Sequence, residues 1–430
     1  MRQISRVTGL GAVALVVAGL FWTPTWSNPP RKHLPWKTGF WVWAGDSPAE
    51  SETKPDLLYV QVPGARWPDN VPEASQYVMV RRIERSSDIT PQIAEALAAV
   101  YTEVRQGGPQ SIVGLQIDYD CPTSRLADYA SFLRDLREAI PPDTHVSITA
   151  LLDWFRPGTE IQEVVQAVDE FVPQFYDAGP ERAASGIAEV IDAEKWAPIF
   201  NALGTPYRIG ISSFGRVARR RANSSGVEQV MYFRDARPFD FAGKKELEPS
   251  IQSTNAGELV VHYTINDVHA RLHSGLAPRD QVDITFPTTE SVRSGYEAVR
   301  RFGGYCAGAI FFRWPGRSET LAFTASEVLE ILTGTSGSSE IEVETREGDC
   351  VSLRCADVYL RLGPDPASTD RRVSVRPNGR VEMFLPDGPL LPRWRQSEEI
   401  TVNIPAYSGL RYVYLGRALS HESVQFEVTP

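Results

Sequence analysis

The sequence of 430 residues predicts an α/β protein, a (β/α)8 barrel followed by a small antiparallel β-sandwich. Between residues 39 and 333, short β-type runs alternate with helical patterns, which is typical of right-handed βαβ units and a parallel sheet. Eight strand candidates occur in this stretch, the number that closes such a barrel. Beyond Gly334 the helical period disappears and only short β-type runs remain.

Runs rich in β-branched and aromatic residues are predicted as the barrel strands. They are Gly39–Ala44, Asp56–Val62, Tyr77–Ile83, Ile112–Asp120, His145–Leu151, Phe171–Asp177, Arg208–Phe214 and Ala307–Trp314. An open doubly wound sheet is the competing interpretation, but no glycine-rich phosphate-binding fingerprint follows the first strand. The barrel is therefore the favoured fold, and we place it at residues 36–333.

Apolar residues at helical spacing predict amphipathic helices between most of these strands and one helix after the last. The helices are Pro91–Arg105, Ser124–Ala139, Thr159–Val168, Ala183–Leu203, Glu290–Phe302 and Ser318–Leu332. The surplus length lies between the seventh and eighth strands, where residues 216–287 are predicted as an insertion over the carboxyl-terminal mouth of the barrel. Within it, Glu258–Ile265 is a β-like run.

A basic run of Arg216, Arg219, Arg220 and Arg221 opens this insertion, and a solvated face is the favoured interpretation over a ligand clamp. After the barrel, residues 334–339 form a Ser/Gly-rich linker. Residues 340–430 contain short β-type runs separated by turn residues, which predicts the accessory β-sandwich. Such a domain can bind carbohydrate, although no residue in it requires that role.

Residues 1–28 have the pattern of an export signal, with Arg2 and Arg6 before an uncharged apolar run from Leu10 to Trp22. This run is shorter than the roughly 20 apolar residues of a membrane span. Its length favours a cleaved signal, and because no clear cleavage site follows, a retained membrane anchor stays the alternative. We expect the protein to be exported to the periplasm, the cell envelope or the medium.

The charge balance narrows the class of ligand. Lysine and arginine total 44 residues against 54 aspartate and glutamate residues, which gives a formal net charge of −10. This balance argues against a nucleic-acid partner, because affinity for phosphates comes from excess positive charge. The expected ligand is therefore a neutral oligo- or polysaccharide.

The four cysteines agree with export. Cys350 and Cys355 are close in sequence and form either a small disulfide loop or two free thiols, which spacing alone does not decide. Cys121 and Cys306 are expected to be unpaired, since they fall at opposite ends of the barrel. His269 and His273 have no acidic partner motif, so neither a metal site nor a cofactor is predicted.

The fourth strand carries the strongest candidate for a functional site. Side chains alternate along a strand, so Gln116, Asp118 and Asp120 share the face that points into the barrel mouth. Two carboxylates at positions i and i+2 lie roughly 6–7 Å apart along the backbone. Their repulsion raises one pKa, so one acid can stay protonated while the other ionises. The alternative is that these aspartates cap the next helix or bind backbone amides.

Other predicted strand ends contribute polar or aromatic side chains, namely Trp43, Asp153, Gln174, Tyr176, Asp177 and Trp314. Aromatic faces beside carboxylates and amides suit a neutral sugar, because rings stack on its C–H face and polar groups bind its hydroxyls. The alternative is that the aromatic rings fill the barrel and its helix contacts. Trp314 is the ring that we expect in the site.

The fourth strand resembles the family 18 chitinase signature D-G-x-D-[aliphatic]-D-x-E. Gly114 matches its glycine and Asp118 its third Asp, whereas Asp120 occupies the position of the catalytic Glu. Val113 and Gln116 stand at the first two Asp positions. The sequence therefore departs from this signature at three of its four acids.

Two further stretches carry the same resemblance. Gln174-Phe-Tyr-Asp177 is similar to the family's sixth-strand Met-x-Tyr-Asp, and Trp314 resembles its floor Trp on the eighth strand. The resemblance implies that Asp120 protonates the glycosidic oxygen, that Asp118 orients an acetamido group and that Tyr176 helps to hold it. Asp120 is one methylene shorter than Glu, so it needs a shifted backbone or substrate to reach the same oxygen.

Leu-Gln-Ile-Asp-Tyr-Asp-Cys-Pro-Thr at 115–123 and Leu-Ala-Asp-Tyr at 126–129 more closely resemble an uncharacterised bacterial family. That family is a domain of unknown function grouped with glycosidase-type barrels. The resemblance spans residues 36–430 and is most specific at 112–129. It implies a sugar-facing barrel and names no reaction.

Three hypotheses follow. The leading one is an exported glycosidase-like protein that binds and hydrolyses an envelope or extracellular glycan, with Asp120 as acid/base and Asp118 as its electrostatic partner. Gln116, Tyr176 and Asp177 would then position the substrate. The second is a non-catalytic carbohydrate-binding or envelope scaffold protein, and the third is an interaction module that uses the β-domain.

Overall fold

The computed structural model describes residues 33–430 apart from 44–47, 50–52, 177–187, 223–227, 233–235, 245–246, 269–274, 318, 335–340, 349, 351–352 and 396–398 and the final residue. The predicted export signal, the Ser/Gly linker and the pair His269 and His273 lie outside the described residues. Among the described residues, no helix is long and apolar enough to cross a membrane.

Eight parallel strands form a closed barrel, as predicted. In chain order they are β1 (Lys37–Val42), β2 (Leu57–Gln61), β3 (Gln76–Ile83), β4 (Ile112–Tyr119), β5 (His145–Ala150), β6 (Glu170–Pro173), β7 (Tyr207–Ser212) and β13 (Cys306–Phe312). Each strand pairs with its neighbours in the sequence of strands, and β1 closes the ring against β13. All eight predicted strands are thus confirmed, with boundaries that differ by a few residues.

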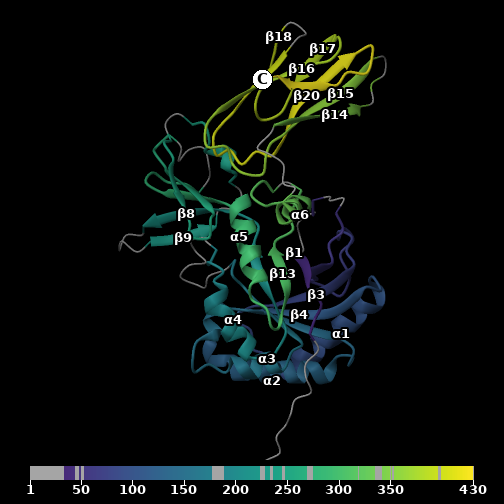
Figure 1. Cartoon of the computed structure of the whole chain (residues 1–430), viewed down its shortest axis with the longest axis vertical. Helices are drawn as coiled ribbons and strands as arrows, with labels where there is room; N and C mark the ends of the chain where they lie inside the picture. The colour runs from purple at the N-terminus through teal and green to yellow at the C-terminus, as the bar shows by residue number, and fades with distance from the viewer. Residues whose placement is uncertain are drawn as a thin grey trace, which may run out of the picture. The chain divides into compact units, whose positions relative to one another are not determined.

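The helices of the barrel lie outside its strands (Figure 1). They are α1 (Pro91–Gly107), α2 (Leu126–Ala139), α3 (Ile161–Gln166), α4 (Ala193–Ala202), α5 (Thr289–Arg300) and α6 (Ala325–Thr333). Two predicted starts are wrong. Helix α4 begins only after Asp192, whose side chain accepts a hydrogen bond from the Lys195 N–H, and α6 begins after Thr324, which forms a capping box with Glu327.

The stretch between β7 and α5 forms a five-stranded antiparallel sheet in the order β10-β11-β12-β8-β9. Its strands are β8 (Arg216–Ala222), β9 (Glu228–Tyr232), β10 (Ser250–Ser253), β11 (Leu259–Thr264) and β12 (Gln281–Phe286). Of these, only β11 was predicted. The basic run forms most of β8, and its placement as a solvated face is wrong for Arg220 and Arg221. These two side chains bind the buried carboxylates of Asp283 and Asp280.

The carboxyl-terminal part contains two four-stranded antiparallel sheets, in the orders β14-β15-β20-β17 and β18-β19-β16-β21. Their strands are β14 (Glu342–Gly348), β15 (Arg354–Arg361), β16 (Arg371–Pro377), β17 (Met383–Pro386), β18 (Arg393–Arg395), β19 (Glu399–Ile404), β20 (Tyr412–Ser420) and β21 (Phe426–Thr429). Both sheets contribute to one hydrophobic cluster that includes Val358 and Val375. Cys350 and Cys355 form a disulfide, whereas Cys121 and Cys306 are free, as expected.

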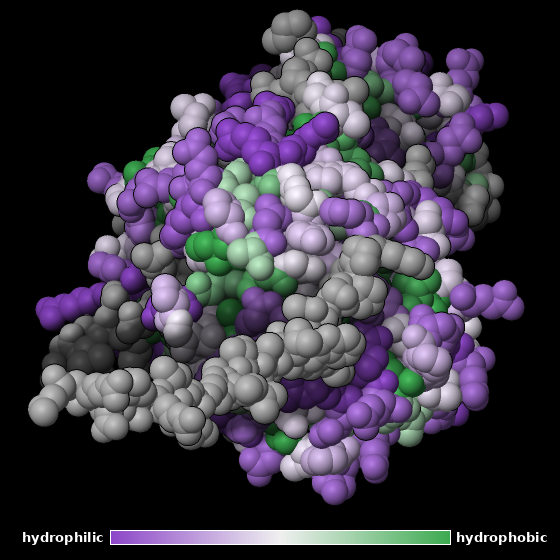
Figure 2. Space-filling view, turned by 60° about the horizontal axis from the view of Figure 1, so that its bottom comes forward, coloured by the Kyte–Doolittle hydropathy of each residue, from purple (hydrophilic) through white to green (hydrophobic). Residues whose placement is uncertain are grey.

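Arg411, just before β20, joins this part to the barrel. Its guanidinium lies 3.0 Å from the Glu327 carboxylate and donates a 2.9 Å hydrogen bond to the Ala322 carbonyl. It also covers the Phe323 ring at 4.4 Å. On the face shown in Figure 2, the coloured surface is largely polar and hydrophobic residues occur in small separate groups.

Candidate functional site

A small pocket opens at the carboxyl-terminal ends of the barrel strands. Its lining residues are Trp41, Val42, Trp43, Gln61, Val80, Asp118, Thr149, Tyr176 and Phe312. Its cavity volume is only about 10 Å³, roughly the space that one water molecule needs. This is far below the roughly 300–1,000 Å³ of pockets that hold drug-sized ligands. The lining side chains therefore nearly fill the pocket, and a ligand of sugar size would lie over its mouth.

Asp118 is the acidic side chain of this pocket. It is the last inward-facing residue of β4, and the Thr149 hydroxyl of neighbouring β5 donates a 2.8 Å hydrogen bond to its Oδ1. Strand alternation therefore places Asp118 as the sequence predicts. The bond from Thr149 orients the carboxylate toward the space above the strands.

Four aromatic rings line the same pocket as Asp118. Tyr176 stacks on Phe312 with ring centroids 4.1 Å apart and an interplanar angle of 5°. The Trp41 ring meets Tyr176 edge-on at 5.3 Å, and Trp43 meets Phe312 edge-on at 5.8 Å. Such contacts fix the rings relative to one another, so the pocket presents a preformed aromatic wall.

Gln116 lies directly beneath the pocket. The side chain is fully buried, accepts a 2.7 Å hydrogen bond from Trp41 Nε1, and donates a 3.1 Å bond to Ser147 Oγ. It faces inward, as the sequence predicts, but it is covered by Trp41. Gln116 therefore contacts the pocket through the indole that it holds in place.

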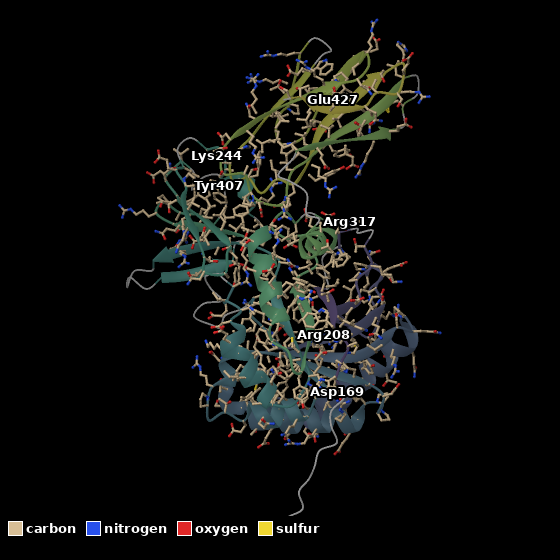
Figure 3. The ribbon with its side chains drawn as sticks, viewed as in Figure 1. Asp169, Arg208, Lys244, Arg317, Tyr407 and Glu427 are labelled. Carbon is tan, nitrogen blue, oxygen red and sulfur yellow. A yellow bond between two sulfur atoms is a disulfide. The ribbon has the colours of Figure 1, made fainter. Side chains whose placement is uncertain are left out.

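A polar network continues from Ser147 to the amino-terminal end of the barrel. Ser147 Oγ donates a 3.2 Å bond to Glu170 Oε1, which also accepts a hydrogen bond from the Tyr59 hydroxyl. Glu170 forms an ion pair with Arg208, and both side chains are buried. Figure 3 labels Arg208 among the barrel strands. Neither residue is among the predicted site residues, although each lies at or next to the start of its strand, where a buried charge is unusual.

Asp120 lies one residue beyond β4 and is not among the residues that line the pocket. Burial raises its pKa, because the charged carboxylate loses solvation, while the nearby guanidinium groups of Arg82 and Arg85 act in the opposite direction. The structure thus brings Asp118 into the pocket and leaves Asp120 outside its lining, near Arg82 of β3 and Arg85.

The remaining candidate residues fall in different places. Tyr176 and Trp43 line the pocket, Gln174 is buried between β5 and β7, and Asp153 binds Arg156 in a surface turn. Asp177 lies outside the described residues.

Trp314 is a core residue in the structure. It packs edge-on against Phe40 at 5.5 Å, and its Nε1 donates a 2.9 Å bond to the Ala49 carbonyl. Phe312 occupies the pocket in place of the expected tryptophan. The reason is that β13 ends at Phe312, so strand alternation no longer determines where Trp314 points.

Glu258, before β11, is a buried acid near the barrel mouth that the sequence analysis did not single out. Its Oε2 accepts a 2.9 Å bond from the Ala188 N–H. Burial raises its pKa to about 7, opposed by the Ala188 N–H, Arg216 and Ser212. Arg216 in turn donates a 3.2 Å bond to the carbonyl of the pocket residue Tyr176.

We expect Glu258→Gln to remove a pH dependence of stability. Between the ordinary pKa of 4.5 and about 7, the unfolded chain ionises this carboxyl while the folded chain keeps its proton. The free energy of unfolding of the native protein should therefore fall by roughly 3 kcal/mol as pH rises through this window. Urea unfolding at pH 5, 6, 7 and 8 measures this fall. An equally steep fall in the variant would contradict the assignment.

Metal ligands are a separate question. In the part of the chain that the structure describes, no group of three or more His, Cys, Asp and Glu side chains is arranged to hold a metal ion.

Comparison with solved structures found similar chains that carry chitinase or spore cortex-lytic names. The C-terminal domain of a protein assigned as a chitinase from Desulfitobacterium hafniense DCB-2 is 12% identical, with a TM-score of 0.46, over 70% of this chain and 99% of that chain. The spore cortex-lytic enzyme SleL of Bacillus megaterium QM B1551 is 10% identical, with a TM-score of 0.43, over 70% and 75%. A chitinase from Rhizomucor miehei is 11% identical, with a TM-score of 0.41, over 69% and 99%.

A search of curated proteins found no match to the sequence. A family model did match, and its region runs from the first residue of β3 into the sheet inserted after β7. Residues 76–247 of the chain thus match the family described as Domain of unknown function (DUF3142).

Proposed function

We propose that the protein is an exported glycosidase-like barrel that binds a neutral oligo- or polysaccharide of the envelope or extracellular space and hydrolyses a glycosidic bond in it. The observation that carries this proposal is the pocket at the barrel mouth, where the Asp118 carboxylate lies among aromatic rings. In barrels of this kind, functional groups occur at the carboxyl-terminal ends of the strands.

The pocket supports sugar binding through two complementary surfaces. The aromatic side chains of Trp43 and Phe312 line the pocket and provide apolar contacts for the C–H side of a pyranose ring, and the Asp118 carboxylate accepts hydrogen bonds from its hydroxyls. Thr149 orients that carboxylate before the ligand arrives. Because the cavity itself is so small, we propose that a single sugar unit lies over its mouth against these side chains and that the rest of the glycan extends outward.

Hydrolysis needs a proton donor and an ionised partner. In this proposal Asp120 donates the proton to the glycosidic oxygen, since burial raises its pKa and favours the protonated form. Asp118 stays ionised and stabilises the positive charge that develops on the sugar, while the Tyr176 side chain helps to position the substrate.

Export is part of the same proposal. It is supported by the signal-like pattern of residues 1–28 and by the disulfide between Cys350 and Cys355, because disulfides persist mainly in oxidising compartments. Fractionation of the producing cells, followed by immunodetection of the protein, would test it. Detection in the cytoplasm alone would contradict export.

The decisive experiment incubates the full chain with a panel of neutral bacterial polysaccharides and analyses the products by mass spectrometry. Shortened glycans are the expected result. Binding of a glycan without product release would instead favour a second function, a non-catalytic carbohydrate-binding protein. That alternative is favoured by one observation, the position of Asp120 outside the pocket lining. Absence of glycan binding would overturn both functions.

A further inference from the structure

A second and larger pocket lies where helix α5 meets the carboxyl-terminal sheets. Its cavity volume is about 160 Å³, well above that of the pocket at the barrel mouth and large enough for a compact ligand. Helix α5 contributes Thr289 and Arg293, and β16 contributes Arg371. The connections before β16 and before β20 form the remaining walls.

Hydrogen bonds hold these walls together. The Asp365 carboxylate accepts a 2.7 Å bond from the Thr289 N–H at the start of α5, and the Tyr407 N–H donates a 2.9 Å bond to the Ala367 carbonyl. The bonds of Arg411 to the barrel lie directly after Leu410, the last residue of the pocket wall. The pocket is therefore built from fixed backbone segments on both sides.

Arg293 and Arg371 make the lining of this pocket positively charged. Both side chains are half-buried, and within the described part of the chain neither forms an ion pair or a side-chain hydrogen bond. Asp365 is the acidic residue of the lining, and its carboxylate already caps α5. The lining thus contains two cations against one engaged anion, and a concave surface concentrates such a field on whatever enters it.

The other side chains of the lining indicate what kind of molecule would carry an anionic group into this pocket. Apolar side chains of Leu362, Pro364, Ile404 and Leu410 share the pocket with the two arginines. A bare inorganic anion would leave the apolar part of the lining without a contact, whereas a ring with an acidic substituent can contact both kinds of surface. Guanidinium groups bind carboxylates and phosphates through paired hydrogen bonds, so the acidic group can be either one.

We propose that this pocket binds an acidic monosaccharide unit, with Arg293 and Arg371 on its carboxylate or phosphate group and the apolar wall against its ring. The site is separate from the barrel mouth and does not depend on the function proposed for Asp118. An acidic sugar bound here contacts both α5 and β16 and so stabilises their association.

Isothermal titration calorimetry of the full chain with glucuronate, glucose 6-phosphate, glucose and inorganic phosphate tests this proposal. We expect glucuronate or glucose 6-phosphate to bind at least about tenfold more tightly than glucose and inorganic phosphate. Whichever acidic sugar binds more tightly identifies the acidic group. Equal binding of glucose, or equal binding of inorganic phosphate, would overturn the proposal.

Variants locate the site. Arg293→Ala and Arg371→Ala should each weaken binding of the acidic sugar about 10- to 100-fold. Arg372→Ala is the matched control, because Arg372 is the next residue of β16, is exposed and does not line the pocket. If Arg371→Ala folds poorly, Arg371→Lys takes its place. Lysine keeps the charge but loses the paired hydrogen-bond geometry, so we expect binding intermediate between those of the wild type and a variant without the charge.

Asp118→Asn separates this proposal from the function of the barrel mouth, since it should leave binding of the acidic sugar unchanged. Retention of wild-type affinity in the double variant Arg293→Ala/Arg371→Ala would overturn the pocket assignment. Loss of affinity in Asp118→Asn would overturn it as well, because the ligand would then occupy the barrel mouth.

Discussion

Glu170→Ala is expected to lower the free energy of unfolding by about 3–5 kcal/mol. Glu170 is fully buried in the barrel and forms an ion pair with the buried guanidinium of Arg208. Removing the carboxylate leaves a cation in a low-dielectric interior with no counter-charge. It also removes the carboxylate oxygen that accepts hydrogen bonds from both the Ser147 and the Tyr59 hydroxyls. Each of these buried donors then loses this acceptor, which adds to the cost.

Urea unfolding followed by circular dichroism measures this loss. Glu163→Ala is the matched control, because the exposed Glu163 carboxylate of α3 lies 3.8 Å from Arg134, and such surface pairs contribute less than about 1 kcal/mol. The double variant Glu170→Met/Arg208→Met should recover much of the stability, since apolar side chains of similar length remove both charges. A loss below about 1 kcal/mol in Glu170→Ala would show that Arg208 is solvated despite its burial.

The barrel was predictable because its strands have a sequence pattern that the rest of the fold does not override. Each is a short apolar run and most are followed by a helical pattern, and burial on both faces demands such a composition in a parallel sheet. The orientation of Asp118 followed from the same regularity, since alternation holds up to the last residue of a strand.

The inserted sheet and the ends of the strands were less predictable. Strand β8 was not recognised because its arginines are typical of a solvated segment. The buried carboxylates that pair with two of them, Asp283 and Asp280, lie about sixty residues later in the sequence, in β12 and just before it. Trp314 and Asp120 both lie beyond the last residue of their strands, where turn geometry rather than alternation sets direction. Which aromatic ring entered the pocket therefore depended on where β13 ended.

Asp120→Asn is expected to reduce turnover of a polysaccharide substrate by about 10²- to 10⁴-fold, while folding and sugar binding persist. Asparagine keeps the shape of the side chain but has no proton to transfer. Burial raises the pKa of Asp120, so the wild-type acid keeps its proton to higher pH than an exposed aspartate does, and turnover should fall as pH rises through that pKa. The turnover number, measured by product formation across pH, tests both statements.

Two further variants separate catalysis from binding. Asp118→Asn should weaken sugar binding as well as turnover, because Asp118 lines the pocket and Asp120 does not. Asp128→Asn, at an exposed position in the first turn of α2, is the matched control and should change neither. Wild-type turnover in Asp120→Asn would exclude Asp120 as the acid. A glycan bound equally by wild type and Asp120→Asn, with product from neither, would instead mean that the barrel retains a sugar site without the reaction.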